Sequence, residues 1–133
     1  MKIAIKRVDE SLMFSEFDGV YRSDAAQCFL DKYTDRRAIW LDADRCLAFI
    51  CDAAGLCKNL PLNFFLEVPT SPWPVQAIVG DVIFVRTKPV NIWEQEIYDY
   101  EVEDITEADI QYITKLLSWE TQRRLFTEYR NGR

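Results

Sequence analysis

The feature that most constrains the fold is a run of four apolar residues, 82–85, with the sequence VIFV. Successive side chains of a strand point to opposite faces of a sheet, so an apolar residue at every position predicts a strand covered on both faces. Gly80 and Asp81 interrupt the longer apolar segment 76–87, where we expect a β-bulge or a close approach of another backbone. The run therefore predicts a strand inside a sheet rather than at its edge.

A β-hairpin is predicted over residues 38–51. Two apolar segments, 38–41 and 46–51, are joined by the polar turn 42–44, which is the pattern typical of paired antiparallel strands. We expect this hairpin to lie next to the strand at 82–85, because both are apolar enough to share one buried sheet.

Three helices are predicted before and after this central region. Ser23 suits a helix N-cap, so we expect a helix from Ser23 to about residue 33. Thr106, followed three residues later by Asp109, resembles a capping box and predicts a helix to about residue 117. Ser118 is then placed to cap a last helix.

Further extended segments are predicted at residues 2–8, at 12–14 and, as one strand or two, at 92–104. Together these elements predict a single α+β domain over residues 1–133. Its sheet is mixed or antiparallel with about five strands, with a helix after the first strands, two C-terminal helices, and the helices on one face.

The segment 58–74 is predicted to be irregular, because proline disfavours both helices and central strands. Three prolines lie within six residues of this segment: Pro69, Pro72 and Pro74. We expect at most one helical turn, over residues 63–66.

Composition favours a folded chain, since 49% of the 133 residues are apolar and 29% are charged. The N-terminal residues alternate as in a strand, not as in a signal peptide, and no apolar run approaches the roughly 20 residues of a membrane span. We therefore expect a cytoplasmic protein without membrane contact.

The four cysteines are predicted to be free thiols in a reducing compartment. Cys46 and Cys51 lie at odd separation in one expected strand, so they point to opposite faces, and without histidine or a CxxC pair we expect no metal site. The lack of histidine excludes Ser-His and Cys-His catalysis, and four glycines supply no phosphate-binding loop. We expect no catalytic residues and no cofactor.

One order of elements resembles a known family: a short strand, a helix, a hairpin, an LPLN loop and a Gly-interrupted apolar strand. The family comprises small proteins of bacteriophages and conjugative elements, a domain of unknown function. The resemblance covers roughly residues 1–115 and rests on five segments, 38–51, 52–55, 60–63, 78–84 and 104–110. The proline-rich insert 69–74 and the helix after Ser118 depart from the pattern. The resemblance implies a mobile-element context in a bacterial host cell and no particular activity.

Charge is unevenly distributed along the chain. Eight carboxylates and no lysine or arginine fall between residues 89 and 114, although the net charge of the whole chain is only −6. In a strand, Asp99, Glu101 and Glu103 would form an exposed row about 6.6–6.8 Å apart, close to the repeat of nucleic-acid phosphates. The alternative is a sheet edge whose charges prevent pairing with another chain.

Four further residues are candidates for binding. Trp73, held between two prolines, suits a recognition surface or a lid over the core. Asn63 in the LPLN loop suits either a ligand or a turn. Arg36 and Arg37 form a small basic spot that suits an anion or a solvated pair.

The leading hypothesis is a non-enzymatic accessory protein of phage type that binds a host or defence protein through Asp99, Glu101, Glu103 and Trp73. The alternative is a small-molecule binder that sequesters a nucleotide signal under the 58–74 loop, with Asn63, Arg36 and Arg37 at the ligand. The second alternative is a carboxylate-based enzyme. Duplex DNA is not an expected partner, because the sequence pI is about 4.7.

Overall fold

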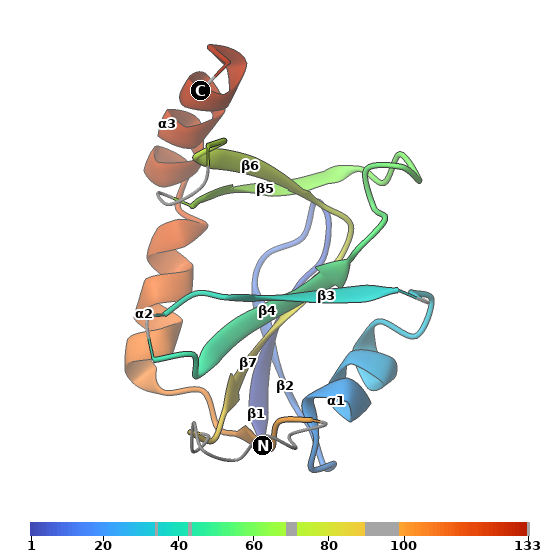
Figure 1. The fold of residues 1–133 in the computed structure, drawn as a ribbon. Coiled ribbons are helices and arrows are strands. Elements are labelled where there is room, and N and C mark those ends of the chain that lie inside the picture. The colour runs from blue at the N-terminus through green and yellow to red at the C-terminus, as the bar shows by residue number, and fades with distance from the viewer. Residues whose placement is uncertain (34, 43, 69–71, 90–98, 133) are drawn as a thin grey trace.

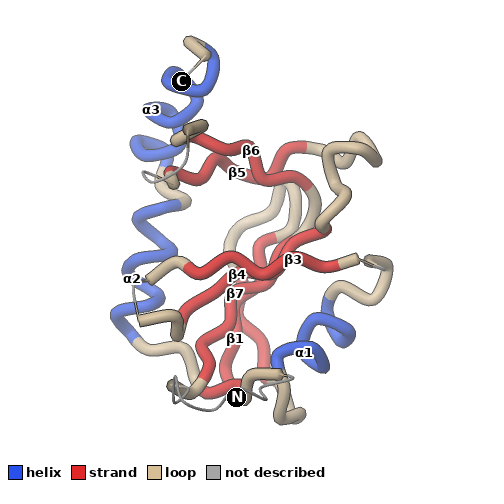
Figure 2. The backbone as a smooth tube through the Cα atoms, in the orientation of Figure 1, coloured by secondary structure: helices blue, strands red, loops and turns tan. Residues whose placement is uncertain are grey.

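The fold is described from a computed structural model, for residues 1–33, 35–42, 44–68, 72–89 and 99–132. These residues form three helices and eight strands, and the strands make two antiparallel sheets (Figures 1 and 2). In chain order the elements are β1 (Lys2–Lys6), β2 (Met13–Glu16), α1 (Arg22–Phe29), β3 (Arg36–Trp40), β4 (Leu47–Asp52), β5 (Leu62–Glu67), β6 (Val75–Val79), β7 (Val82–Thr87), β8 (Val102–Glu103), α2 (Glu107–Leu116) and α3 (Trp119–Arg130). The predicted α+β class with two C-terminal helices is confirmed.

The larger sheet has six strands, in the order β2-β1-β7-β4-β3, with β8 pairing beside the end of β7. It is larger than the predicted sheet of about five strands. β7 lies between β1 and β4, which confirms that the run 82–85 is an interior strand. The β3–β4 hairpin is also confirmed, and Asp42 closes its turn by accepting hydrogen bonds from the N–H groups of Cys46 at 2.9 Å and Leu47 at 3.0 Å.

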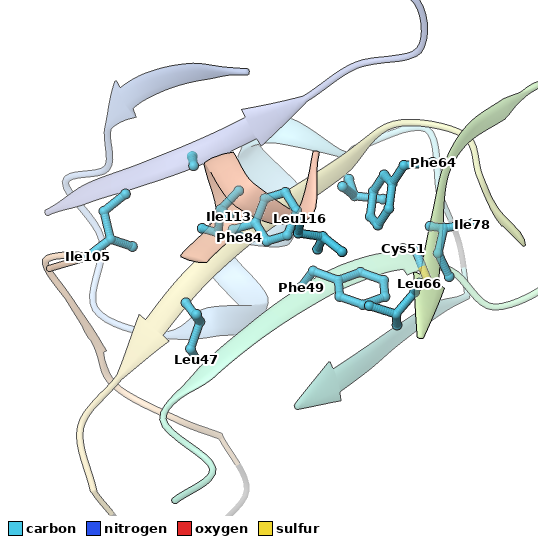
Figure 3. Packing of buried hydrophobic residues seen from close by; sticks show 12 residues of the cluster. Leu47, Phe49, Cys51, Phe64, Leu66, Ile78, Phe84, Ile105, Ile113 and Leu116 are labelled. Carbon is cyan, nitrogen blue, oxygen red and sulfur yellow. The ribbon is translucent and has the colours of Figure 1, made fainter. Parts of the chain in front are cut away.

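The six-stranded sheet is covered on both faces, and the helices do not share one face as predicted. Alternate residues of β7 explain this, because Phe84 belongs to one buried cluster and Ile83 to another. The Phe84 cluster includes Ile113 of α2 (Figure 3), whereas the Ile83 cluster includes Ala25 and Leu30, from α1 and its C-cap. A strand that is apolar at every position therefore has a helix on each side of it.

The smaller sheet is a ribbon of two strands, β5 and β6. The predicted helical turn over residues 63–66 is wrong, because alternate side chains of β5 have separate buried sites. Phe64 and Leu66 pack in the cluster that also contains Phe84, whereas Phe65 packs with Leu125 of α3. The ribbon thus lies between α3 and the six-stranded sheet (Figure 1).

Gly80 separates β6 from β7, and the predicted single strand with a bulge over 76–87 is wrong. Gly80 has φ +75°, a conformation that glycine adopts readily, and it directs the chain from the ribbon into the larger sheet. On the side where a Cβ atom would point, the close neighbours of Gly80 are side chains rather than the expected backbone, since a Cβ atom at Gly80 would lie 2.5 Å from the Tyr33 hydroxyl oxygen.

The helix caps agree with the sequence at α2 and α3 but not at α1. Thr106 and Asp109 form the predicted capping box, and the Ser118 hydroxyl accepts a hydrogen bond from Thr121 N–H at 3.3 Å. The predicted cap at Ser23 is wrong, because Tyr21 is the N-cap of α1 and makes no side-chain cap. Within the described residues, none of the helices is long and apolar enough to cross a membrane.

Candidate binding groove

A groove of about 580 Å³ runs beside β6. Its walls are the whole of β6, the end of β4 with the turn that follows it, Tyr129 near the C-terminal end of α3, and Gly132 just after that helix. Arg37 of β3 and Trp73, which lies just before β6, complete the lining. Ligand sites in proteins are typically about 300–1,000 Å³, so the groove is large enough for a small molecule or a short peptide.

Three large apolar side chains that line the groove are exposed. Trp73 and Leu56 are each 69% exposed, and Tyr129 is 46% exposed. The Tyr129 ring packs against Phe65, and the two ring centroids are 5.1 Å apart. Exposed apolar side chains that share one concave surface indicate a binding site more strongly than the same residues scattered singly.

The charged groups of the groove are few, and one of them is neutralised. The Asp52 carboxylate is fully buried and accepts hydrogen bonds from Lys58 Nζ at 2.7 Å and Ala54 N–H at 2.8 Å. Burial alone would raise the pKa of Asp52, but the bonds from Lys58 and Ala54 outweigh it and hold the pKa below its usual value. Arg37 is exposed on the edge strand β3 and is the cation among the groove's described residues.

The backbone of β6 has an unpaired edge beside this groove, along which Val75 is buried and Ala77 and Val79 are half-buried. Pro74 C=O accepts a hydrogen bond from Val68 N–H at 2.6 Å, and Gly80 N–H donates to Pro61 C=O at 2.8 Å, so even-numbered residues face β5. Backbone groups of an antiparallel strand alternate between its two sides, so those of Val75, Ala77 and Val79 point away from β5. Within the described part of the chain, no hydrogen bond or strand pairing engages these three residues on that side.

The opposite edge of the ribbon is capped by a side chain. Phe65 N–H donates to Gln122 Oε1 at 2.7 Å, and Gln122 Nε2 donates to Phe65 C=O at 3.0 Å. The amide of Gln122 thus imitates a neighbouring strand, and its Nε2 also donates to Leu116 C=O at 2.8 Å. The two edges of one ribbon therefore differ: the chain covers the β5 edge and leaves the β6 edge to the groove.

The structure separates the candidate residues of the nucleotide hypothesis. Arg37 lines the groove with Trp73, whereas Arg36 donates to Leu30 C=O at 3.5 Å. Asn63 has a structural role, because its Nδ2 donates to Lys6 C=O and Gly80 C=O, both at 2.8 Å, and its Oδ1 accepts from Lys6 Nζ at 3.0 Å. Asn63 thereby joins β1, β5 and the Gly80 turn, and it lies within a strand rather than in the predicted loop.

The three acidic residues do not form the predicted exposed row. Asp99 precedes the strand, is half-buried, and accepts hydrogen bonds from the backbone and hydroxyl of Ser23. Glu101 is exposed and lies 3.5 Å from Lys88 Nζ, while Glu103 is half-buried on β8. Only the last part of the predicted strand is seen, since β8 begins at Val102 and residues 92–98 lie outside the described residues.

The described residues offer carboxylates and thiols as possible metal ligands and nucleophiles. No cluster of three or more histidine, cysteine, aspartate or glutamate side chains that could hold a metal ion is found there. All four cysteines are free thiols, as predicted, with Cys28 and Cys57 exposed and Cys46 and Cys51 buried. Burial raises the pKa of the Cys46 and Cys51 thiols, which makes them poor nucleophiles.

No family model matches this chain, and no curated protein or solved structure matches it either. The likeness to proteins of bacteriophages and conjugative elements therefore stays a prediction.

Sequence reasoning identified Trp73 and Arg37 separately but missed the groove that contains both. The sequence did not predict that residues 76–87 divide into two strands, β6 and β7, which belong to different sheets. Two turn signals were available, the glycine at position 80 and the proline at 61, and Gly80 N–H donates to Pro61 C=O at the end of the ribbon. Tyr129 and Leu56 carried no signal, because exposed apolar residues are common on helices and turns.

Proposed function

We propose that this protein acts by binding, and that it receives an apolar segment of a partner protein in the groove beside β6. One observation carries this proposal: Trp73, Leu56 and Tyr129, from three segments far apart in the sequence, are exposed around one groove. Tryptophan and tyrosine are enriched among the residues that dominate binding energy at protein interfaces. Asp99, Glu101 and Glu103 have a smaller part in partner binding than the sequence predicted, because the Asp99 carboxylate already accepts hydrogen bonds from Ser23.

A host or defence protein is the partner class that the resemblance to phage-type proteins favours. The net charge of −6 favours a partner that is basic around its binding segment, since opposite charges accelerate association. The same charge disfavours duplex DNA as a partner. Catalysis is not part of the proposal, because the buried carboxylate of the groove, Asp52, is already paired with Lys58.

A nucleotide is the second candidate, and the presence of Arg37 and Trp73 in one groove favours it. Arg37 would meet a phosphate, and Trp73 would stack on a base. Among the described residues, however, Arg37 is the cation that lines the groove, and phosphate sites usually combine several donors. The groove's apolar walls therefore suit a peptide better than a nucleotide.

Selection from a displayed library of random peptides tests the proposal. Peptides that bind the native protein are compared on the Trp73→Ala variant and on Trp119→Ala, a matched control because Trp119 is 72% exposed and lies outside this groove. We expect Trp73→Ala to weaken binding by about 30-fold, as for a central tryptophan, and Trp119→Ala to change it less than about twofold. Equal losses in both variants, or no peptide that depends on Trp73, would overturn the proposal.

Two cysteines supply an independent readout of where the ligand lies. Cys57 is exposed and lines the groove, whereas Cys28 is exposed on α1. A bound peptide should slow the reaction of a maleimide with Cys57 and leave its reaction with Cys28 unchanged. Thermal-shift measurements with a panel of nucleotides, on the native protein and on Arg37→Gln, test the second candidate. A shift that Arg37→Gln removes and Arg36→Gln retains would favour the nucleotide.

A further inference from the structure

We infer that the partner's segment binds in an extended conformation, as a strand added to the free edge of β6, and this inference rests on the proposed function. The edge offers the backbone N–H and C=O groups of Val75, Ala77 and Val79, which no described residue engages. All five residues of β6 line the groove, so a segment in the groove lies directly beside these groups. Strand addition of this kind supplies affinity through main-chain hydrogen bonds and specificity through pockets for alternate side chains.

The β5 edge shows what the chain does where it closes a strand on its own. There the Gln122 amide supplies one donor and one acceptor to Phe65, with distances of 3.0 Å and 2.7 Å. No equivalent side chain reaches Ala77, its register partner on β6, among the described residues. A strand edge left open is a template for pairing with another chain, so the asymmetry favours an incoming strand on the β6 side.

The dimensions of the edge define the length of the segment. β6 has five residues, Val75–Val79, and a strand rises about 3.3 Å per residue, so the edge is about 16 Å long. Its outward groups are spaced two residues apart, which matches the hydrogen-bonding positions of an antiparallel or parallel partner. Pro74 before the strand and the Gly80 turn after it end the edge. A segment of about five residues is therefore sufficient.

The walls of the groove define the chemistry of the segment. Side chains of an added strand alternate between two faces, one toward α3 with Tyr129 and the other toward the turn that contains Leu56. Both directions meet exposed apolar groups, so we expect apolar side chains at successive positions of the segment. The negative net charge of the protein favours lysine or arginine at the flanks.

A scan of N-methylated peptides tests strand addition. The scan uses a five-residue peptide whose binding depends on Trp73. Each of its backbone N–H groups is methylated in turn, which removes one hydrogen-bond donor and leaves the side chain unchanged. We expect affinity to fall at least about tenfold at alternate positions and less than about threefold at the positions between them, because only alternate N–H groups face β6. A uniform loss, or no loss at any position, would overturn strand addition.

Amide hydrogen exchange of the protein in the peptide complex tests strand addition through the N–H groups of β6 instead of those of the peptide. The Ala77 and Val79 amides should become at least about tenfold slower in exchange when the peptide binds, whereas the Phe65 amide, already bonded to Gln122, should not change. Strand addition fails, and the proposed function survives, if a Trp73-dependent peptide binds without these changes. Both fail if no Trp73-dependent peptide exists. Protection of Ala77 that rises with protein concentration and without peptide would assign the edge to a second copy of this chain and overturn the inference.

Discussion

β7 of the six-stranded sheet and β6 of the β5–β6 ribbon are both apolar strands, but the chain pairs β7 on both of its sides and β6 on only one among the described residues. β7 has β1 and β4 on its two sides and a buried cluster on each face. β6 has β5 on one side, and its other side faces the groove. We therefore expect stability to be concentrated in the sheet, whereas the ribbon supplies the proposed binding surface.

Removing a large side chain from the sheet should have the largest effect. Phe84 is fully buried on β7, with its ring centroid 6.1 Å from those of both Phe49 and Phe64. Phe84→Ala should lower the free energy of unfolding by about 3–5 kcal/mol, measured by urea denaturation, because a cavity remains. Phe14→Ala on the edge strand β2, where the ring is 41% exposed, should lower it by less than about 1 kcal/mol. Equal effects would contradict the central position of β7.

Breaking the ion pair between β7 and α2 should have the next largest effect. Arg86 Nε lies 2.6 Å from Asp109 Oδ2, and the Asp109 side chain is only 6% exposed. Asp109→Asn leaves the Arg86 guanidinium without its counter-charge, so we expect a loss of about 3 kcal/mol in the free energy of unfolding. Glu107→Gln, an exposed position on the same helix, is the control and should change stability by less than about 0.5 kcal/mol.

The same pair predicts how stability depends on pH. Burial raises the pKa of Asp109, but the hydrogen bonds and charge of Arg86 outweigh it and hold the pKa below the usual 3.8. A depressed carboxyl pKa stabilises the fold above the unfolded value, and this contribution is lost as the pH falls from about 4 through the folded value. Asp109→Asn should therefore flatten the acid limb of a stability–pH curve. An unchanged acid limb would show that Asp109 is not held ionised.

Removing the cap of the β5 edge should have a smaller and local effect. Gln122→Ala leaves the N–H and C=O groups of Phe65 without their partner, so we expect a loss of about 1–3 kcal/mol and faster exchange of the Phe65 amide. Gln111→Ala, exposed on α2, should change neither quantity appreciably. If Gln122→Ala also leaves the Phe65 amide protected, the two edges of the ribbon do not differ as described.

Thiol reactivity should separate the buried cysteines at β4 from the exposed cysteines without any change in the chain. The native protein should react with a thiol reagent rapidly at Cys28 and Cys57 and slowly at Cys46 and Cys51, because the latter pair is buried and burial raises their pKa. The unreduced, denatured protein should show four thiols, since all four are free. Rapid reaction of Cys46 or Cys51 would show that the sheet opens more readily than its packing implies.

The sequence predicted the six-stranded sheet better than the β5–β6 ribbon, for a physical reason. A run that is apolar at every position, such as 82–85, identifies an interior strand directly, and the β3–β4 hairpin followed from local turn chemistry. The ribbon depends on distant contacts, because Phe65 is held by Gln122 far along the chain. Whether a strand edge is covered also depends on tertiary contacts. The prolines near Trp73 predicted irregular structure, whereas the segments on either side of them pair as β5 and β6.

The proposed binding mode depends on the open edge of β6, and amide hydrogen exchange of the free protein shows whether that edge is open. Gln76 and Ile78 face β5 in paired positions, whereas Ala77 and Val79 face the groove. We predict that the amides of Gln76 and Ile78 exchange at least about tenfold more slowly than those of Ala77 and Val79. Equal protection of all four amides would contradict the account, because it would mean that the β6 edge is already covered in the free protein.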